Sequence, residues 1–220
     1  MCGRYTLTTP DLSPIAEALG VSLPPVVVSY NIAPGVMVPI VRATAPAAYE
    51  LVYVKWGLVP HWAKEPKSDY STINARAETV AAKPAFRDAF RRRRCLVPAD
   101  GFYEWQKRGT HKQPWYIHRR DRKPFAFAGL WERWQKGEET LETCTIIVTE
   151  ASGLVRAIHE RMPVILSPAD YRRWLDPGAE PSQLGALLAP YAGGDLVAQP
   201  VSTRVNDPRH DGPELIEPLG

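Results

Sequence analysis

Hydrophobic positions along the chain predict short strands joined by tight turns. Runs that are apolar or that alternate with polar residues, and that are rich in β-branched and aromatic side chains, have the length and composition of strands. They occupy Tyr49 to Lys55, Pro114 to His118, Pro124 to Leu130, Thr143 to Thr149 and Pro163 to Leu166. Several of these strands must pair in the antiparallel direction, because strands and helices do not alternate regularly along the chain.

Polar residues and prolines predict a small number of helices at the periphery. Ser13 followed by Pro14 is typical of a helix start and Gly20 of its end, and Ser167-Pro168-Ala169-Asp170 is a second start of the same kind. The stretches 74–82 and 84–92 are rich in Ala, Glu and Arg, which favours two more helices separated at Pro84.

These elements predict an α+β fold, in which a single mixed domain is built around an antiparallel, barrel-like β-sheet with peripheral helices. The chain has no internal repeat, low-complexity tract or long linker, which favours one compact unit. We expect this domain to span residues 2–206, and residues 207–220 to form a loose C-terminal tail.

Composition narrows the class of protein. The chain has 220 residues, of which 45% are hydrophobic, and no run is long and apolar enough for a membrane helix. Its N-terminus, MCGRYTLTTP, lacks the apolar core of a secretory signal, so we expect a cytoplasmic, nucleoid-associated protein that does not bind membranes. The 3 cysteines are widely spaced, which indicates reduced thiols, with neither a disulfide framework nor a metal site.

Positive charge is concentrated in one part of the chain. The formal net charge is only +3, but between Lys83 and Lys123 there are thirteen Lys and Arg against four Asp and Glu, a local charge of +9. Such a segment with interleaved aromatic residues is typical of a surface that binds a polyanion. A solvated, arginine-rich helix end at 91–94 is an equally simple interpretation.

Cys2 is the first candidate for chemistry. Initiator methionine is normally removed before a residue as small as cysteine, which would leave an N-terminal cysteine. Its α-amine and thiol form a 1,2-aminothiol, and their ordinary pKa values of about 8 and about 8.5 leave part of each deprotonated at neutral pH. An aldehyde can form an imine with the amine, and the thiol can then close a five-membered thiazolidine ring.

Four segments carry a resemblance to a known family. In chain order they are MCGRY at the N-terminus, INARAET at 73–79, CLVPADGFYEW at 95–105 and IHERMPVIL at 158–166. Together they resemble the signature motifs of the SOS-response-associated peptidase (SRAP) family, whose members crosslink to abasic sites in single-stranded DNA through an N-terminal cysteine. The resemblance covers most of residues 2–206.

The resemblance implies a role for each matching residue. The catalytic group would be the nucleophile Cys2, the orienting Asn74, the acid Glu104 and His159. Glu104 lies between aromatic residues, which would raise its pKa by desolvation, and we assign it to proton transfers around Cys2. His159 has an ordinary pKa near neutrality, and we assign it to opening of the abasic sugar ring. If each were met alone, Glu104 would be interpreted as a surface residue and His159 as part of a polar cluster.

The resemblance also implies the partner. Backbone phosphates would be bound by Arg4, Arg76 and Arg161, with Trp62 as an apolar platform beside the lesion. We expect a monomer that acts on single-stranded DNA containing abasic sites, without metal or other cofactor. The chemistry would be crosslinking and lyase-like, with cysteine peptidase activity of the autoprocessing kind.

Other classes remain as alternatives. N-terminal-nucleophile amidohydrolases also begin with a processed Met-Cys-Gly and use the α-amine as the base for the thiol. A peptidase acting on other chains and a DNA-binding module without catalysis are further interpretations. An amidohydrolase would need an oxyanion hole, and it would not explain the GFYEW and HERMP segments.

Overall fold

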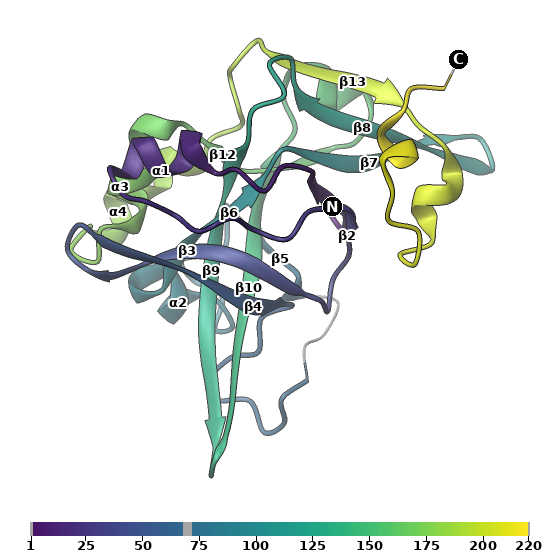
Figure 1. Cartoon of the computed structure of the whole chain (residues 1–220). Coiled ribbons are helices and arrows are strands. Elements are labelled where there is room, and N and C mark those ends of the chain that lie inside the picture. The colour runs from purple at the N-terminus through teal and green to yellow at the C-terminus, as the bar shows by residue number, and fades with distance from the viewer. Residues whose placement is uncertain (1, 68–71, 220) are drawn as a thin grey trace.

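The strands of the molecule form two sheets, and short helices lie at their edges (Figure 1). The computed structural model describes residues 2–67 and 72–219. This architecture confirms the predicted α+β fold with its barrel-like sheet. None of the helices in the described part of the chain is long and apolar enough to cross a bilayer.

The larger sheet closes on itself. The strands that form the closed part pair in the order β10 (Glu139–Glu150), β4 (Ala48–Trp56), β3 (Met37–Ala45), β6 (Arg94–Ala99) and β9 (Phe125–Lys136). Because β9 pairs back with β10, these strands form a barrel. The short strands β5 (Asn74–Arg76), β11 (Arg161–Pro163) and β12 (Ile165–Leu166) extend it. Beyond the barrel, the β9–β10 hairpin projects downward in Figure 1.

The smaller sheet carries the N-terminal strand. Its spatial order is β13 (Leu196–Pro200), β8 (His111–Arg119), β7 (Gly101–Arg108), β1 (Tyr5–Leu7) and β2 (Ser29–Ile32). All of these pairings are antiparallel. The N-terminus therefore lies between the two sheets, near the middle of the molecule (Figure 1).

The helices are short and peripheral, as predicted. The α-helices are α1 (Ser13–Leu19), α2 (Arg87–Arg92), α3 (Tyr171–Leu175) and α4 (Pro181–Leu184). The 3-10 helices are η2 (Gly153–Ala157), η3 (Pro168–Asp170), η4 (Gly185–Leu188), η5 (Thr203–Asn206) and η6 (Pro213–Ile216). Gly20 ends α1 in the left-handed conformation, which confirms its predicted role as the stop.

Strand β1 is fixed at several points, and this fixes the N-terminus. The buried ring of Tyr5 meets Trp56 and Phe127 edge-on, with centroid distances of 5.3 and 5.9 Å. The buried Asp100 accepts hydrogen bonds from the hydroxyls of Thr6 and Thr8, both at 2.6 Å. These contacts tie β1 to the barrel and to the corner between β6 and β7.

The C-terminal segment is packed, in contrast to the expected loose tail. Leu215 is fully buried in a second apolar cluster with Tyr103 and Tyr116, and the backbone N–H of Leu219 donates to Pro200. In Figure 1 this segment lies against β7 and β8. Residues 207–214 are mostly polar and therefore do not predict this packing. A single buried leucine, Leu215, anchors the segment.

One predicted helix is absent. Residues 74–82 begin as strand β5, which pairs in parallel with Ile146 to Val148, and continue as hydrogen-bonded turns. Ala75 is fully buried beside β10, so tertiary pairing overrides the helix propensity of Ala, Glu and Arg. The next predicted helix is present, but it begins at Arg87 rather than Pro84.

The predicted strands are all present, within β4, β8, β9 and β10, and divided between β11 and β12. The strands that were not predicted are β1, β2, β3, β5, β6, β7 and β13. The segment 101–108 has a buried first half and a more exposed second half, so its hydrophobic pattern does not alternate.

Candidate functional site

Cys2 lies in a closed environment at the start of β1. Its side chain is fully buried, and its thiol donates a long hydrogen bond of 3.9 Å to the carbonyl of Arg4. The amide Nδ2 of Asn74 donates to the carbonyl of Cys2 at 2.8 Å. Asn74 is itself placed by the pairing of β5 with Ile146, so β5 holds the backbone of the nucleophile candidate.

Asn74 has a second polar atom directed into the protein. Its Oδ1 is buried and has no hydrogen-bond partner among the described residues. A buried amide oxygen without a partner is costly, and a donor brought to it would be stabilised.

The surroundings of Cys2 favour the thiol over the thiolate. Burial raises the pKa of Cys2 well above its ordinary value, and the negative charge of Glu104 raises it further. A base close to this thiol is therefore needed before it can act as a nucleophile.

Glu104 has the properties of such a base. It lies on β7 opposite Trp115, and it is only 2% exposed. Desolvation raises its pKa to about 7, although a hydrogen bond from the backbone N–H of Trp105 opposes the shift. A carboxyl group with this pKa can both accept and donate a proton near neutral pH.

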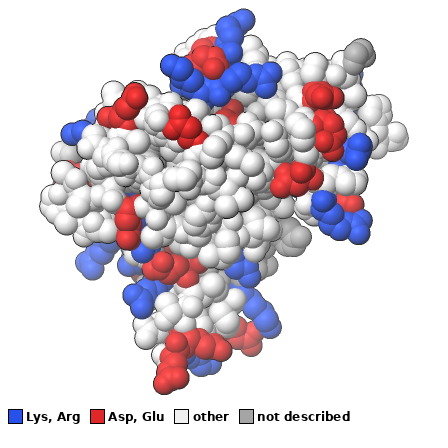
Figure 2. All heavy atoms as spheres, in the orientation of Figure 1, with Lys and Arg blue, Asp and Glu red and all other residues white. Residues whose placement is uncertain are grey.

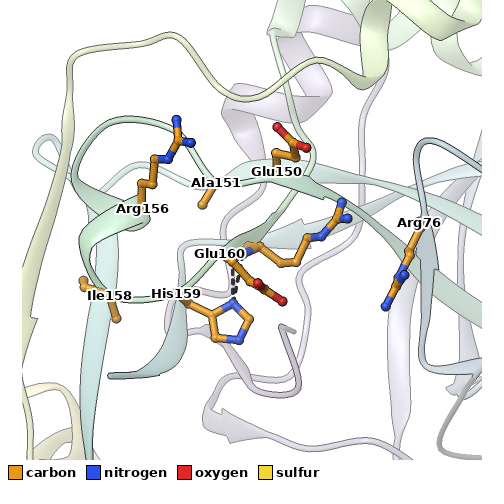
Figure 3. A pocket seen from close by; sticks show the side chains of 8 residues that line it. Arg76, Glu150, Ala151, Arg156, Ile158, His159 and Glu160 are labelled. Atoms are coloured by element: carbon orange, nitrogen blue, oxygen red, sulfur yellow. Dashed lines mark hydrogen bonds between the residues drawn. The ribbon is translucent and has the colours of Figure 1, made fainter. Parts of the chain in front are cut away.

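His159 lies beside Glu104 and is held in one orientation. It precedes β11, and its Nδ1 accepts a hydrogen bond of 2.9 Å from the backbone N–H of Arg161 (Figure 3). Because Nδ1 accepts this bond, the geometry assigns the proton of the neutral ring to Nε2. Desolvation lowers the pKa of His159, which also favours the neutral ring. Its Nδ1 is 4.0 Å from Oε2 of Glu104.

A polar hollow of about 520 Å³ opens next to His159 (Figure 3). It is lined by Arg76, Glu150, Ala151, Arg156, Ile158, His159, Glu160 and Arg161. The pairing of the strands explains why two arginines line the same hollow, because Arg76 on β5 is level with Val148 and Arg161 on β11 with Glu150. Strands β5 and β11 lie on opposite edges of β10, so these cations flank one strand.

Arg4 is partly engaged within the protein. Its Nη1 donates to Oδ1 of Asn31 at 2.7 Å and to the carbonyl of Val205 at 2.6 Å. Desolvation lowers its pKa. Asn31 in turn donates to the carbonyls of Asp207 and His210, so the C-terminal segment helps to hold Arg4.

Trp62 lies outside the lining of the hollow. It follows β4 in a loop, and the residue is 57% exposed. The neighbouring His61 is held by the buried Glu132, at 3.2 Å, and Glu132 also accepts from Arg93. Large exposed apolar side chains are often contact surfaces.

The basic segment does not form one surface. Helix α2 and the β7–β8 hairpin, which carry much of its charge, lie on different sides of the molecule (Figure 1). Arg94 is buried and donates to the carbonyls of Trp174, Phe90, Arg91 and Asp176, so it is structural. On the face shown in Figure 2, Lys and Arg are interspersed with Asp and Glu.

Glu78 and most residues that line the hollow, including Arg156, were not singled out from the sequence. Arg156 lines the hollow from η2, and Glu78 pairs with Arg161. Glu78 lies within the segment INARAET and could have been noticed there, two residues after Arg76. Nothing in the local sequence marks Arg156. Among the described residues, no group of three or more His, Cys, Asp or Glu side chains could hold a metal ion.

Comparison with known proteins gives consistent matches over the whole chain. The model of the family "SOS response associated peptidase (SRAP)" matches residues 1–208. Abasic site processing protein YoqW of Bacillus subtilis is 42% identical over 227 residues, covering 99% of both chains. Abasic site processing protein YedK of Escherichia coli is 33% identical over 100% of both chains. The protein named HMCES in Gallus gallus is 37% identical and matches 77% of this chain and 57% of its own length.

Solved structures agree with this match. A protein from Bacteroides thetaiotaomicron has a TM-score of 0.86 and 26% identity, covering 99% of this chain and 100% of its own. A protein from Bordetella bronchiseptica has a TM-score of 0.78 and 28% identity, covering 91% of this chain and 100% of its own.

Proposed function

Because the chain belongs to the SOS response associated peptidase family, we propose that it processes abasic sites in DNA. The finer proposal is that it crosslinks to an abasic site in single-stranded DNA through Cys2 once Met1 is removed. Relatives that match its whole length are named abasic site processing proteins, which supports the choice of substrate.

One observation carries the chemical part of the proposal. The backbone of Cys2 is anchored by Asn74, beside a carboxyl group whose pKa is about 7 and a neutral imidazole. Capture of an aldehyde as a thiazolidine needs an amine and a thiol on adjacent carbons, together with groups that exchange protons near neutral pH. This combination supports aldehyde capture.

The proposed reaction begins with the abasic sugar, whose cyclic hemiacetal opens to the aldehyde. The α-amine of Cys2 adds to the aldehyde carbon, and the resulting carbinolamine loses one water molecule to give an imine. The sulfur then adds to the same carbon while the nitrogen gains a proton, which closes the thiazolidine. No oxidant, reductant or cofactor is consumed.

Each polar group has a proposed part in these steps. Glu104 takes the proton from the thiol and returns protons around Cys2, while His159 exchanges a proton with the sugar ring oxygen from Nε2. The buried Oδ1 of Asn74 can accept a hydrogen bond from the α-amine. The raised pKa of the Cys2 thiol explains why such a base is needed.

The DNA strand is proposed to follow the hollow. Arg76 and Arg161 bind its phosphates, and Trp62 provides the apolar platform. Arg4 is proposed to contribute a phosphate contact with the donors that Asn31 and Val205 do not use. Arginine makes no demand on base identity at a phosphate, so recognition should be independent of sequence.

The test is incubation with an oligonucleotide that carries one abasic site, followed by heating and intact mass spectrometry. We expect an adduct whose mass is that of the Met1-free protein plus the oligonucleotide minus one water. An oligonucleotide whose aldehyde has been reduced to the alcohol serves as the control and should give no adduct.

Cys2→Ser should abolish the heat-stable adduct, because an oxygen analogue of the ring persists poorly. Wild-type yields from Cys2→Ser would disprove the thiazolidine, and the absence of any adduct with the wild-type protein would disprove the crosslinking function. Amide hydrolysis by the same preparation would instead support the amidohydrolase or peptidase interpretation.

A further inference from the structure

One arginine of the hollow, Arg161, already forms an ion pair with a glutamate. The guanidinium Nη1 of Arg161 donates to the carboxylate Oε1 of Glu78. The Arg161 side chain is 19% exposed and the Glu78 side chain 44%, so the pair lies at the mouth of the site, where solvent and ligands can reach it.

The pairing of β5 and β11 with β10 brings the two residues of this ion pair together. Arg76 is level with Val148, and the backbone N–H of Ala77 donates to the carbonyl of Val148 at 2.9 Å. The backbone then turns, with the N–H of Thr79 donating to the carbonyl of Arg76 at 3.1 Å, and Glu78 lies in this turn within reach of Arg161. Arg161 approaches the same strand end from the other edge, where it is level with Glu150.

Glu78 is charged under neutral conditions. Partial desolvation raises its pKa, but hydrogen bonds from its own backbone N–H and from Arg161, with the charges of Arg161 and Arg76, bring the net pKa below its ordinary value. A carboxylate that is hydrogen-bonded to a guanidinium resembles a phosphate oxygen in charge and geometry.

The charge of the hollow is balanced as a result. Its lining includes the cations Arg76, Arg156 and Arg161 and the anions Glu150 and Glu160, and Glu78 adds a third carboxylate at its mouth. A phosphate that takes Nη1 of Arg161 must replace Glu78, and one that uses the remaining donors must approach its carboxylate, so in both cases Glu78 offsets part of the new ion pair.

We propose that Glu78 is a competing anion for Arg161 that keeps the site's affinity for intact single-stranded DNA low. Retention of a strand then depends on the covalent step, which only an abasic site permits. This inference rests on the proposed function and assigns a specificity-determining role to a residue outside the reacting group.

Removing the charge of Glu78 leaves the scaffold in place. A partly exposed ion pair contributes little to stability, and neither partner belongs to the hydrophobic core. Glu78→Gln is isosteric and should fold like the wild type, so a change in binding can be attributed to the site.

The experiment measures fluorescence anisotropy of an unmodified single-stranded oligonucleotide at several salt concentrations. We expect Glu78→Gln to bind about two- to fivefold more tightly at low salt, the range expected for one partly exposed ion pair. The salt dependence should steepen by about 0.7, which corresponds to one more net phosphate contact. Glu139→Gln removes an exposed carboxylate from the β9–β10 hairpin, and it should leave both quantities unchanged.

A double-mutant cycle identifies the partner. Arg161→Gln and the double variant Glu78→Gln/Arg161→Gln should differ in affinity much less than the wild type and Glu78→Gln do, because only the weaker Coulombic interaction of Glu78 with Arg76 then remains. Unchanged or weaker binding by Glu78→Gln overturns the proposal, and so does a gain of the same size when Arg161 is absent.

Crosslinking to an abasic oligonucleotide is measured in parallel. If the wild type forms no adduct, the proposed function fails whatever the affinities are. If the adduct forms and Glu78→Gln gains no affinity, only the role of Glu78 fails.

Discussion

Burial controls the protonation of the groups around Cys2. The thiol is fully enclosed and stays protonated, while the carboxyl group of Glu104, which is almost as enclosed, has a pKa close to neutrality. The imidazole of His159 is shifted in the opposite direction, because desolvation disfavours its cationic form. The same desolvation therefore disfavours the charged form of each of these three groups.

The rate of crosslink formation should depend on Glu104 and on pH. If the carboxylate is the base, the wild-type rate should rise as pH increases through about 7, where Glu104 loses its proton. Glu104→Gln should be slower by about 100-fold and should lack this inflection. Rates measured between pH 6 and 8, with the exposed Glu139→Gln as the control, test this point. An unchanged profile in Glu104→Gln would show that another group is the base.

His159 should act at a different step from Glu104. His159→Ala should slow capture of a cyclic abasic sugar by at least about 10-fold, and its defect should shrink with an acyclic aldehyde that has no ring to open. Glu104→Gln should also slow transfer of a preformed adduct to competitor DNA, because thiazolidine opening needs a proton at the leaving group. His111→Ala, at the exposed start of β8, is the control. Equal defects of both variants in all assays would contradict separate roles.

At the scale of elements, the site depends on how β7 packs between its neighbouring strands. This strand pairs with β1 on one side and with β8 on the other, and it carries Glu104. Gly101 opens the strand directly against the ring of Tyr116, where a Cβ atom would overlap the ring carbons and the hydroxyl. The absence of a side chain at this position permits the close approach of β7 to β8.

Gly101→Ala should therefore lower stability and crosslinking together. Overpacking of this kind costs about 1–3 kcal/mol, equivalent to a fall in Tm of roughly 2–12 °C for a chain of this size. Thermal unfolding and adduct yield are the measurements. Gly185→Ala is the matched control, because no atom lies within 4 Å of its added Cβ. A wild-type Tm for Gly101→Ala would mean that Tyr116 moves aside without cost.

At the scale of the whole molecule, the two ends of the chain meet. Arg4 directly precedes β1 and donates to the carbonyl of Val205 in η5, while Asn31 on β2 donates to the carbonyls of Asp207 and His210 in the C-terminal segment. Tyr103, one residue before Glu104, packs in the same cluster as Leu215. The C-terminal segment thus packs against the residues that support the site, although none of its described residues lines the hollow.

Leu215→Ala should destabilise the protein by about 2–5 kcal/mol, the range for loss of a fully buried leucine. Leu219→Ala, at a position 47% exposed, should change stability by less than about 0.5 kcal/mol. Unfolding in denaturant measures both. Equal stabilities would show that the segment after Asn206 contributes nothing to the fold.

The sequence by itself determined the class of fold and the family. Runs of apolar residues located β4, β8, β9 and β10, because a strand buried on one or both faces must be apolar wherever it lies. Four short motifs identified the family, since each contains several residues in a fixed order. They also selected Cys2, Asn74, Glu104 and His159, whose roles remain proposals.

Only the tertiary structure decided which charges meet. The run 91–94 is contiguous in sequence, yet Arg94 is buried among carbonyls while its neighbours line a different surface from the hollow. Conversely, Glu78 and Arg161 are far apart in sequence and form an ion pair, because β5 and β11 flank the same strand. Strand pairing joins distant segments through backbone hydrogen bonds, and the local sequence of a three-residue strand such as β5 carries too little pattern to predict its partner.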